Sequence, residues 1–219
     1  MNMLGLKTVL QRSAALAAAA ALLLSVSGCS QTTHFYTLAP METGAALTPP
    51  GAAHTAVIAV GPVTIPDYVN RPQIVVRTSA TEVKQASFDQ WAGDLDEMIP
   101  RLLVEDLGAR LPTDRFVVFP QISDLAFDYR IPISISRFDV SPSGGAVIVA
   151  RWQVRHGATD KIVVHESHAH ADAVGNGYED MVAALSRAIA ILTDEIAADL
   201  ASMPRGEVGA AKAPSKATK

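Results

Sequence analysis

From residue 56 onward, hydrophobic positions fall into short continuous runs and two longer helical stripes. The short runs are bounded by proline, glycine or polar residues, which is typical of buried strands. They predict strands at 56–63, 74–77 and 115–120, and a weaker pattern predicts a further strand at 81–88. The two stripes repeat every three or four residues, the spacing of an amphipathic helix. They predict one helix over Trp91–Leu111 and a second over Asn176–Met203.

Capping residues and prolines indicate where the two helices begin. Asp89 and Asp94 are alternative N-cap residues for the first helix, and Pro100 either kinks that helix or marks its true first turn. Asn176, followed by Glu179 three residues later, resembles a capping box at the start of the second helix.

Between the helices, three predicted strand segments are separated by short turns, and apolar and polar residues alternate in the first of them. These segments are 125–140, 146–154 and 161–171. They predict an antiparallel meander. The alternation changes parity after Ile135, which predicts a β-bulge near Ser136 and Arg137. Pro132 lacks a backbone donor, so we expect the first segment to lie at a sheet edge or to be irregular at that residue.

The N-terminal segment has the features of a secretory signal that ends in a lipidation site. Lys7 and Arg12 precede an uncharged alanine- and leucine-rich run, and the segment Val26–Cys29 resembles a bacterial lipobox with Cys29 as the acylated residue. The alternative is a transmembrane anchor, but the apolar run is shorter than the ~20 residues that a span requires. In lipoproteins an aspartate after the cysteine favours the inner membrane, so Ser30 favours the outer membrane.

Composition divides the chain into four parts and excludes some functions. We expect a signal peptide at 1–28, a lipidated N-terminus with a short strand and flexible linker at 29–55, one α/β domain at 56–203, and a disordered basic tail at 204–219. The net charge of −4 does not favour a nucleic-acid-binding protein. Since Cys29 is the only cysteine, its acylation leaves no thiol for a disulfide or a zinc–thiolate site.

Three histidines form the only cluster that suggests a metal site. His168 and His170 share one face of their predicted strand beside Glu166, while His165 points to the other face. The other interpretation is an ordinary solvent-exposed strand face, and we expect no metal and no cofactor. The chain also lacks a G-x-S-x-G nucleophile elbow and a glycine-rich phosphate loop, so no catalytic residues are predicted.

The loop before the 74–77 strand is the candidate partner-binding loop. Its members are Tyr68, Arg71, Pro72 and Gln73. A rigid proline between an arginine and a glutamine is suited to recognition, although simple turn chemistry explains the same residues.

Several motifs together resemble the ABC-type transport auxiliary lipoprotein family, the family of paraquat-inducible protein C. They are the lipobox, Phe35-Tyr36-Thr37-Leu38, Val60-Gly61-Pro62-Val63, Ile65-Pro66, Tyr68, Arg71-Pro72-Gln73-Ile74-Val75, Trp91 before a long helix, and Ser186-Arg187-Ala188. One departure is Gly93-Asp94-Leu95 where the family commonly has a proline after the tryptophan.

The resemblance implies a three-layer α/β fold in which two long helices pack on a mixed sheet, similar to the N-terminal domain of TolB. It also implies an outer-membrane lipoprotein, facing the periplasm, that works with a mammalian-cell-entry (MCE) domain protein in lipid transport. The family has no catalytic residues to transfer.

Three functions follow from these observations. The first is a non-enzymatic docking subunit that is held to the outer membrane by acyl chains on Cys29 and binds an MCE-domain tunnel protein. The second is a periplasmic lipid-binding shuttle. The third is a metalloenzyme built on His168 and His170. The sequence leaves open whether the protein forms a homo-oligomer.

Overall fold

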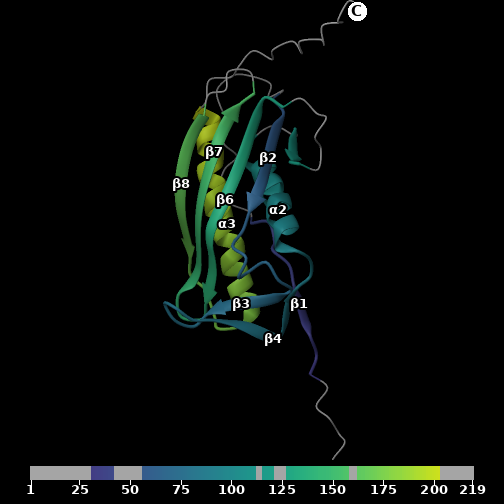
Figure 1. Ribbon diagram of the computed structural model, residues 1–219, viewed down its shortest axis with the longest axis vertical. Coiled ribbons are helices and arrows are strands. Elements are labelled where there is room, and N and C mark those ends of the chain that lie inside the picture. Colours follow the sequence, from purple (N-terminus) through teal and green to yellow (C-terminus); the bar gives the residue numbers. More distant parts are fainter. Residues whose placement is uncertain (1–30, 42–55, 112–114, 121–126, 158–161, 203–219) are drawn as a thin grey trace, which may run out of the picture. The chain divides into compact units, whose positions relative to one another are not determined.

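A five-stranded mixed sheet forms the centre of the fold, with the strand order β5-β2-β6-β7-β8 (Figure 1). Its strands are β2 (Ile58–Thr64), β5 (Phe116–Val118), β6 (Tyr129–Ser141), β7 (Gly145–His156) and β8 (Ile162–Ala171). β2 runs parallel to β5 and β6, whereas β6, β7 and β8 are antiparallel to one another. The predicted meander is therefore confirmed.

The computed structural model describes residues 31–41, 56–111, 115–120, 127–157 and 162–202. From His34 onward these residues belong to one compact unit. The predicted signal peptide, Cys29, most of the predicted linker and the basic tail lie outside the described residues.

β6 shows why the alternation in the sequence was informative. Ile131, Ile133 and Ile135 point into the core with exposures of 0 to 3%. The pairing with β7 shifts between Ile135 and Arg137, so the predicted bulge is confirmed. β6 is an internal strand, so its expected edge position is wrong. The other expectation, an irregularity at Pro132, is confirmed, because the register between β6 and β2 shifts where Pro132 interrupts the ladder.

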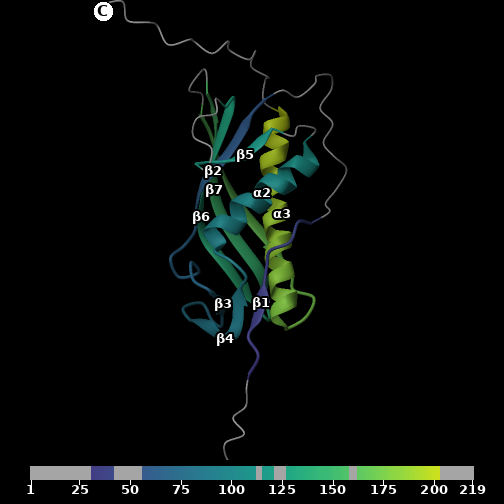
Figure 2. The ribbon, with the colours of Figure 1, turned by 90° about the vertical axis from the view of Figure 1, so that its right-hand side faces the viewer.

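Both helices cover the same face of the five-stranded sheet (Figure 2). α2 spans Leu95–Arg110 and α3 spans Tyr178–Ser202. α2 packs on β2 and β5, and α3 packs on β6, β7 and β8. The apolar stripe of α3 is buried along its length because it faces the inward side chains of the meander.

The predicted start of the first helix requires correction. Trp91 ends a strand, and Asp94 occupies the N-cap position without a side-chain hydrogen bond. Pro100 lies inside the helix and not in its first turn. At the second helix, the side chain of Asp180, and not that of Glu179, accepts a hydrogen bond from a backbone N–H before the helix, that of Gly177 (3.2 Å).

A second, three-stranded sheet lies at one end of the five-stranded sheet (Figures 1 and 2). Its order is β1-β4-β3, with β1 (His34–Tyr36), β4 (Val83–Trp91) and β3 (Gln73–Arg77). β1 pairs in parallel with β4, so residues close to the predicted lipidation site belong to the folded unit.

The α/β class, with a mixed sheet and two long amphipathic helices, is confirmed. The eight described strands form two sheets and not one, and the helices form a single layer. The expected likeness to the TolB N-terminal domain stays a prediction.

Candidate partner-binding site

The loop between β2 and β3 is held by its backbone and by one buried side chain. The N–H of Val69 donates to the carbonyl oxygen of Pro66 (3.1 Å), and the N–H of Arg71 donates to the carbonyl oxygen of Val69 (2.8 Å). The side chain of Val69 is 4% exposed and packs in the core. The carbonyl oxygen of Pro72 accepts from the N–H of Trp91 (2.7 Å), which ties the end of the loop to β4.

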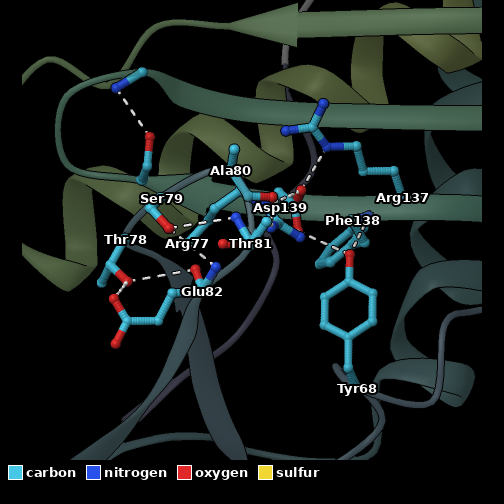
Figure 3. A network of polar contacts seen from close by, with 12 residues as sticks. Tyr68, Arg77, Thr78, Ser79, Ala80, Thr81, Glu82, Arg137, Phe138 and Asp139 are labelled. Atoms are coloured by element: carbon cyan, nitrogen blue, oxygen red, sulfur yellow. Dashed lines mark hydrogen bonds and ion pairs between the residues drawn. The ribbon is translucent and has the colours of Figure 1, made fainter.

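Tyr68 points inward from this loop (Figure 3). Its hydroxyl donates to Oδ1 of Asp139 (2.8 Å) and accepts from the backbone N–H of Phe138 (3.3 Å). Both of these residues belong to β6, so Tyr68 fastens the loop to the five-stranded sheet.

Asp139 is the centre of a polar cluster that also contains Tyr68, Arg77 and Arg137, which we call the Asp139 network (Figure 3). Arg77 binds the carboxylate with two nitrogens, Nε to Oδ2 (2.5 Å) and Nη2 to Oδ1 (3.0 Å). Nε of Arg137 lies 2.5 Å from Oδ2. Since the side chain of Asp139 is only 4% exposed, these charge-assisted bonds replace its lost hydration.

The network sets the protonation states of its members. Burial alone would raise the pKa of Asp139, but hydrogen bonds from Arg77, Arg137 and Tyr68 outweigh burial and lower it. Burial raises the pKa of Tyr68. The hydrogen bonds to Asp139 raise the pKa of Arg77. At neutral pH one carboxylate therefore faces two guanidinium groups, which leaves an excess of positive charge beside the loop.

The four predicted loop residues differ in how accessible they are. Pro72 is exposed, while Arg71 and Gln73 are half-buried. Nε of Arg71 is buried and has no hydrogen-bond partner among the described residues, and its Nη2 makes only a long contact with the carbonyl oxygen of Asp67 (3.5 Å). Arg71, Pro72 and Gln73 thus lie where a partner can reach them, whereas the hydroxyl of Tyr68 is already engaged inside the protein.

The sequence patterns did not indicate Arg77, Arg137 or Asp139 as site residues, although Arg137 lies at the predicted bulge. A signal was present, because Asp139 interrupts an apolar strand between Phe138 and Val140. A charged residue in such a position requires a partner of opposite charge.

The three histidines do not come together. His165 lies under α3, stacked on Trp152 with a centroid distance of 4.6 Å, and its Nε2 lies 3.0 Å from Oδ2 of Asp199. His168 and His170 share the opposite face, and each contacts a carboxylate of its own, Glu166 or Asp172, at 3.1 Å. Within the described residues, no group of three or more metal-ligating side chains is found.

The family model described as "ABC-type transport auxiliary lipoprotein component" matches residues 36–197, from the end of β1 to within α3. The chain belongs to this family. This result confirms the resemblance drawn from the sequence motifs. The family is one of transport auxiliary lipoproteins and not an enzyme family.

The curated relatives of this family member include the intermembrane transport lipoprotein PqiC from Escherichia coli (strain K12) and from Shigella flexneri. Each is 25% identical over 184 residues, which cover 83% of this chain and 95% of the relative. Their names support a membrane-associated transport lipoprotein. In the described part of the chain, neither helix of this family member has the length and apolar character needed to cross a bilayer.

Solved structures support the fold of this auxiliary lipoprotein. A crystal structure of an uncharacterized protein superposes with a TM-score of 0.64 at 24% identity, covering 78% of this chain and 99% of the other. A crystal structure of a protein from Xanthomonas campestris superposes with a TM-score of 0.60 at 16% identity, covering 76% and 93%. Both likenesses concern the fold alone.

Proposed function

We propose that this protein is an outer-membrane lipoprotein, facing the periplasm, that docks an MCE-domain tunnel protein of an ABC-type intermembrane phospholipid transport system. The observation that carries the proposal is the family match over residues 36–197, which begins seven residues after the lipobox cysteine, Cys29. The name of the PqiC relatives, intermembrane transport lipoprotein, favours the same role.

The acyl chains on Cys29 supply the anchor. Each buried methylene contributes about 0.8 kcal/mol to membrane binding, so several chains on one residue hold a domain firmly at a bilayer. Palmitate labelling of cells tests this step. We expect label in the parent protein, none in Cys29→Ala, and outer-membrane density for the parent in a sucrose gradient. Unlabelled protein that is free in the periplasm would contradict the proposal.

The Arg71–Gln73 segment supplies the docking surface. Pro72 restricts the backbone, and the hydrogen bonds at Val69 and Trp91 fix both ends of the loop, so little conformational entropy is lost when a partner binds. Arg71 adds a cation whose Nη2 makes only a long contact with the carbonyl oxygen of Asp67 (3.5 Å), so a partner carbonyl or carboxylate can accept from this guanidinium group.

Recovery of the MCE protein from solubilised envelopes tests the docking surface. We expect the Arg71→Ala/Gln73→Ala double variant to recover about tenfold less partner than the parent, since the loss of two interface hydrogen bonds costs about 1 to 3 kcal/mol. Arg101→Ala is the matched control, because Arg101 is an arginine on α2 with a 62% exposed side chain. Equal recovery by the parent and the double variant would remove the loop from the interface.

Mass spectrometry of the purified protein distinguishes docking from a lipid shuttle. The space between the helices and the sheet is occupied by large buried side chains, among them Leu103, Ile131, Ile148 and Leu185. We therefore expect no stoichiometric phospholipid beyond the acyl chains on Cys29. A second, noncovalent phospholipid at one per chain would favour the shuttle.

A further inference from the structure

The small sheet carries exposed aromatic side chains close to the predicted lipid anchor. Phe35 in β1 is 65% exposed and Phe88 in β4 is 39% exposed. The two strands are adjacent, and Phe88 directly precedes Asp89, the pairing partner of His34. We call Phe35 and Phe88 the aromatic pair.

The two faces of β1 differ sharply. Tyr36 faces the core beside Trp91, and its hydroxyl donates to Oδ1 of Asp89 (2.9 Å). Because side chains alternate along a strand, Phe35 points to the opposite, solvent side with its partner Gln90. The carboxylate of Asp89, the residue after Phe88, is 15% exposed and accepts a hydrogen bond from Tyr36, so it does not place an unshielded negative charge beside the aromatic pair.

The length of chain before β1 determines what can cover these rings. Cys29 and Phe35 are six residues apart, and an extended chain spans at most ~3.3 to 3.6 Å per residue, so their separation is at most about 22 Å. When Cys29 is acylated it lies at the bilayer surface, and Phe35 is therefore within reach of that surface at all times.

We infer that the aromatic pair contacts the phospholipid surface in which Cys29 is anchored, so that the small sheet rests on the membrane. The rings lie in the headgroup region, where apolar side chains are partly removed from water. This contact adds a second attachment point to the acyl chains and orients the domain. The inference rests on the acylation of Cys29 in the proposed function.

A comparable exposed apolar stretch lies far from the anchor and provides the control. Ile162 and Val164 in β8 are 48% and 55% exposed. β8 begins at the end of the five-stranded sheet opposite the small sheet (Figure 1). The aromatic pair and these β8 residues are therefore similar in exposure and differ in their distance along the chain from Cys29.

Fluorescence of the full acylated protein in vesicles tests the contact. The vesicles contain phosphatidylethanolamine with a minority of phosphatidylglycerol, and a fraction of the lipids carry bromine on the acyl chain near the headgroup. Phe35→Trp and, separately, Phe88→Trp report on the aromatic pair, and Val164→Trp is the control. The buried Trp91 and Trp152 contribute the same background to each variant and are subtracted with the parent protein.

We expect brominated lipid to reduce the added emission of Phe35→Trp and Phe88→Trp about twofold, as for rings at the headgroup boundary, and to leave Val164→Trp unchanged. Equal quenching at all three positions, or none at the aromatic pair, would overturn the inference. A third outcome is that brominated lipid does not quench the added tryptophan, while addition of the MCE partner shifts its emission to the blue. This result would assign the aromatic pair to a protein contact and would also overturn the inference.

Flotation of the same samples separates this inference from the proposed function. If the parent protein does not float with the vesicles, anchoring through Cys29 has failed. If it floats while the aromatic pair stays unquenched, the anchor is sound and only the contact of the small sheet is wrong.

Discussion

Two buried polar clusters in this protein use the same residue types in opposite ratios. In the Asp139 network, two arginines surround one carboxylate. Between α2 and α3, one buried arginine, Arg110, lies between the carboxylates of Asp106 and Asp194. We call these last three residues the helix cluster.

The surroundings shift the pKa values of the two buried acids in opposite directions. Hydrogen bonds from Arg77, Arg137 and Tyr68 outweigh burial and lower the pKa of Asp139, whereas burial raises the pKa of Asp106 against the charge of Arg110 and a backbone hydrogen bond from Met41. Asp106 is 1% exposed, and its Oδ2 has no hydrogen-bond partner among the described residues. Three side-chain donors therefore outweigh the burial of Asp139, whereas one arginine and one backbone hydrogen bond do not outweigh the burial of Asp106.

The helix cluster gives the largest expected effect. Arg110 donates to the carbonyl oxygens of Asp106 (2.8 Å) and Ala190 (3.3 Å) and joins Asp194, so it connects the two helices. Arg110→Met leaves Asp106 buried without its cation, and we expect a loss of about 3 kcal/mol in the free energy of unfolding. Urea denaturation followed by circular dichroism measures this loss.

Arg101→Met is the control for Arg110→Met, because Arg101 lies on the same helix with a 62% exposed side chain. It should change the free energy of unfolding by less than about 0.5 kcal/mol. If both substitutions have the same small effect, Arg110 does not connect the helices in the way described.

The Asp139 network gives the next largest effect. Asp139→Asn keeps the shape of the side chain but removes the negative charge that Arg77 and Arg137 share. We expect a loss of about 2 kcal/mol, which is typical of hydrogen bonds to a charged group. Glu97→Gln, at a 57% exposed carboxylate on α2, should be nearly neutral in the same denaturation experiment. A stable Asp139→Asn variant would show that the arginines find other acceptors.

These two clusters mark the limit of what the sequence could predict. The meander, the β6 bulge and the two helices follow from local spacing, because a strand or helix repeats its inward positions at a fixed interval. Asp139 meets Arg77 across 62 positions, and Arg110 meets Asp194 across 84. No local pattern encodes such pairs, so a charged residue within an apolar stretch indicates only that a partner exists.

The candidate loop was predicted in part for the same reason. Prolines at 66 and 72 identified the loop, and its composition indicated Arg71 and Gln73 as accessible residues. Tyr68 points inward because it binds Asp139, which lies in a distant strand. The local sequence does not show this contact, so Tyr68 was predicted to be a partner-binding residue like Arg71 and Gln73. Trp91 was assigned to a helix because its spacing fits the stripe, although its backbone pairs with β1.

Acid titration distinguishes Asp139 from Asp106, because their pKa shifts change the free energy of unfolding in opposite directions as the pH falls. Because the folded-state pKa of Asp139 is lowered, its contribution is fully present above the unfolded pKa of about 3.9 and is lost as the pH falls through the folded value. Asp106 has a raised pKa, so its charged form costs stability at neutral pH, and this cost is relieved as the pH falls through that raised value.

Unfolding free energies measured from neutral pH to below pH 3.9 should therefore decline less steeply in Asp139→Asn than in the parent. The unfolding free energy of Asp106→Asn should decline more steeply than that of the parent between the raised pKa of Asp106 and its unfolded value. The reason is that the variant has no buried charge at position 106 whose cost protonation would relieve. The same slope in all three proteins would refute the assigned directions.

Tyr68→Phe gives the smallest effect and separates the structural part of the loop from its binding part. The substitution removes the hydroxyl that joins Asp139 and the N–H of Phe138, while the ring stays in place. We expect a loss of about 1 kcal/mol in the free energy of unfolding, the typical net value of a hydrogen bond. Recovery of the proposed MCE partner should be unchanged under conditions where the variant is folded. Arg71→Ala should show the reverse, with parental stability and weaker recovery, because the side chain of Arg71 makes only a long contact within the described residues, from Nη2 to the carbonyl oxygen of Asp67 (3.5 Å). If Tyr68→Phe also loses the partner while the fold is retained, then the Asp139 network holds the loop in its binding conformation, and the separation drawn between anchoring and recognition does not hold.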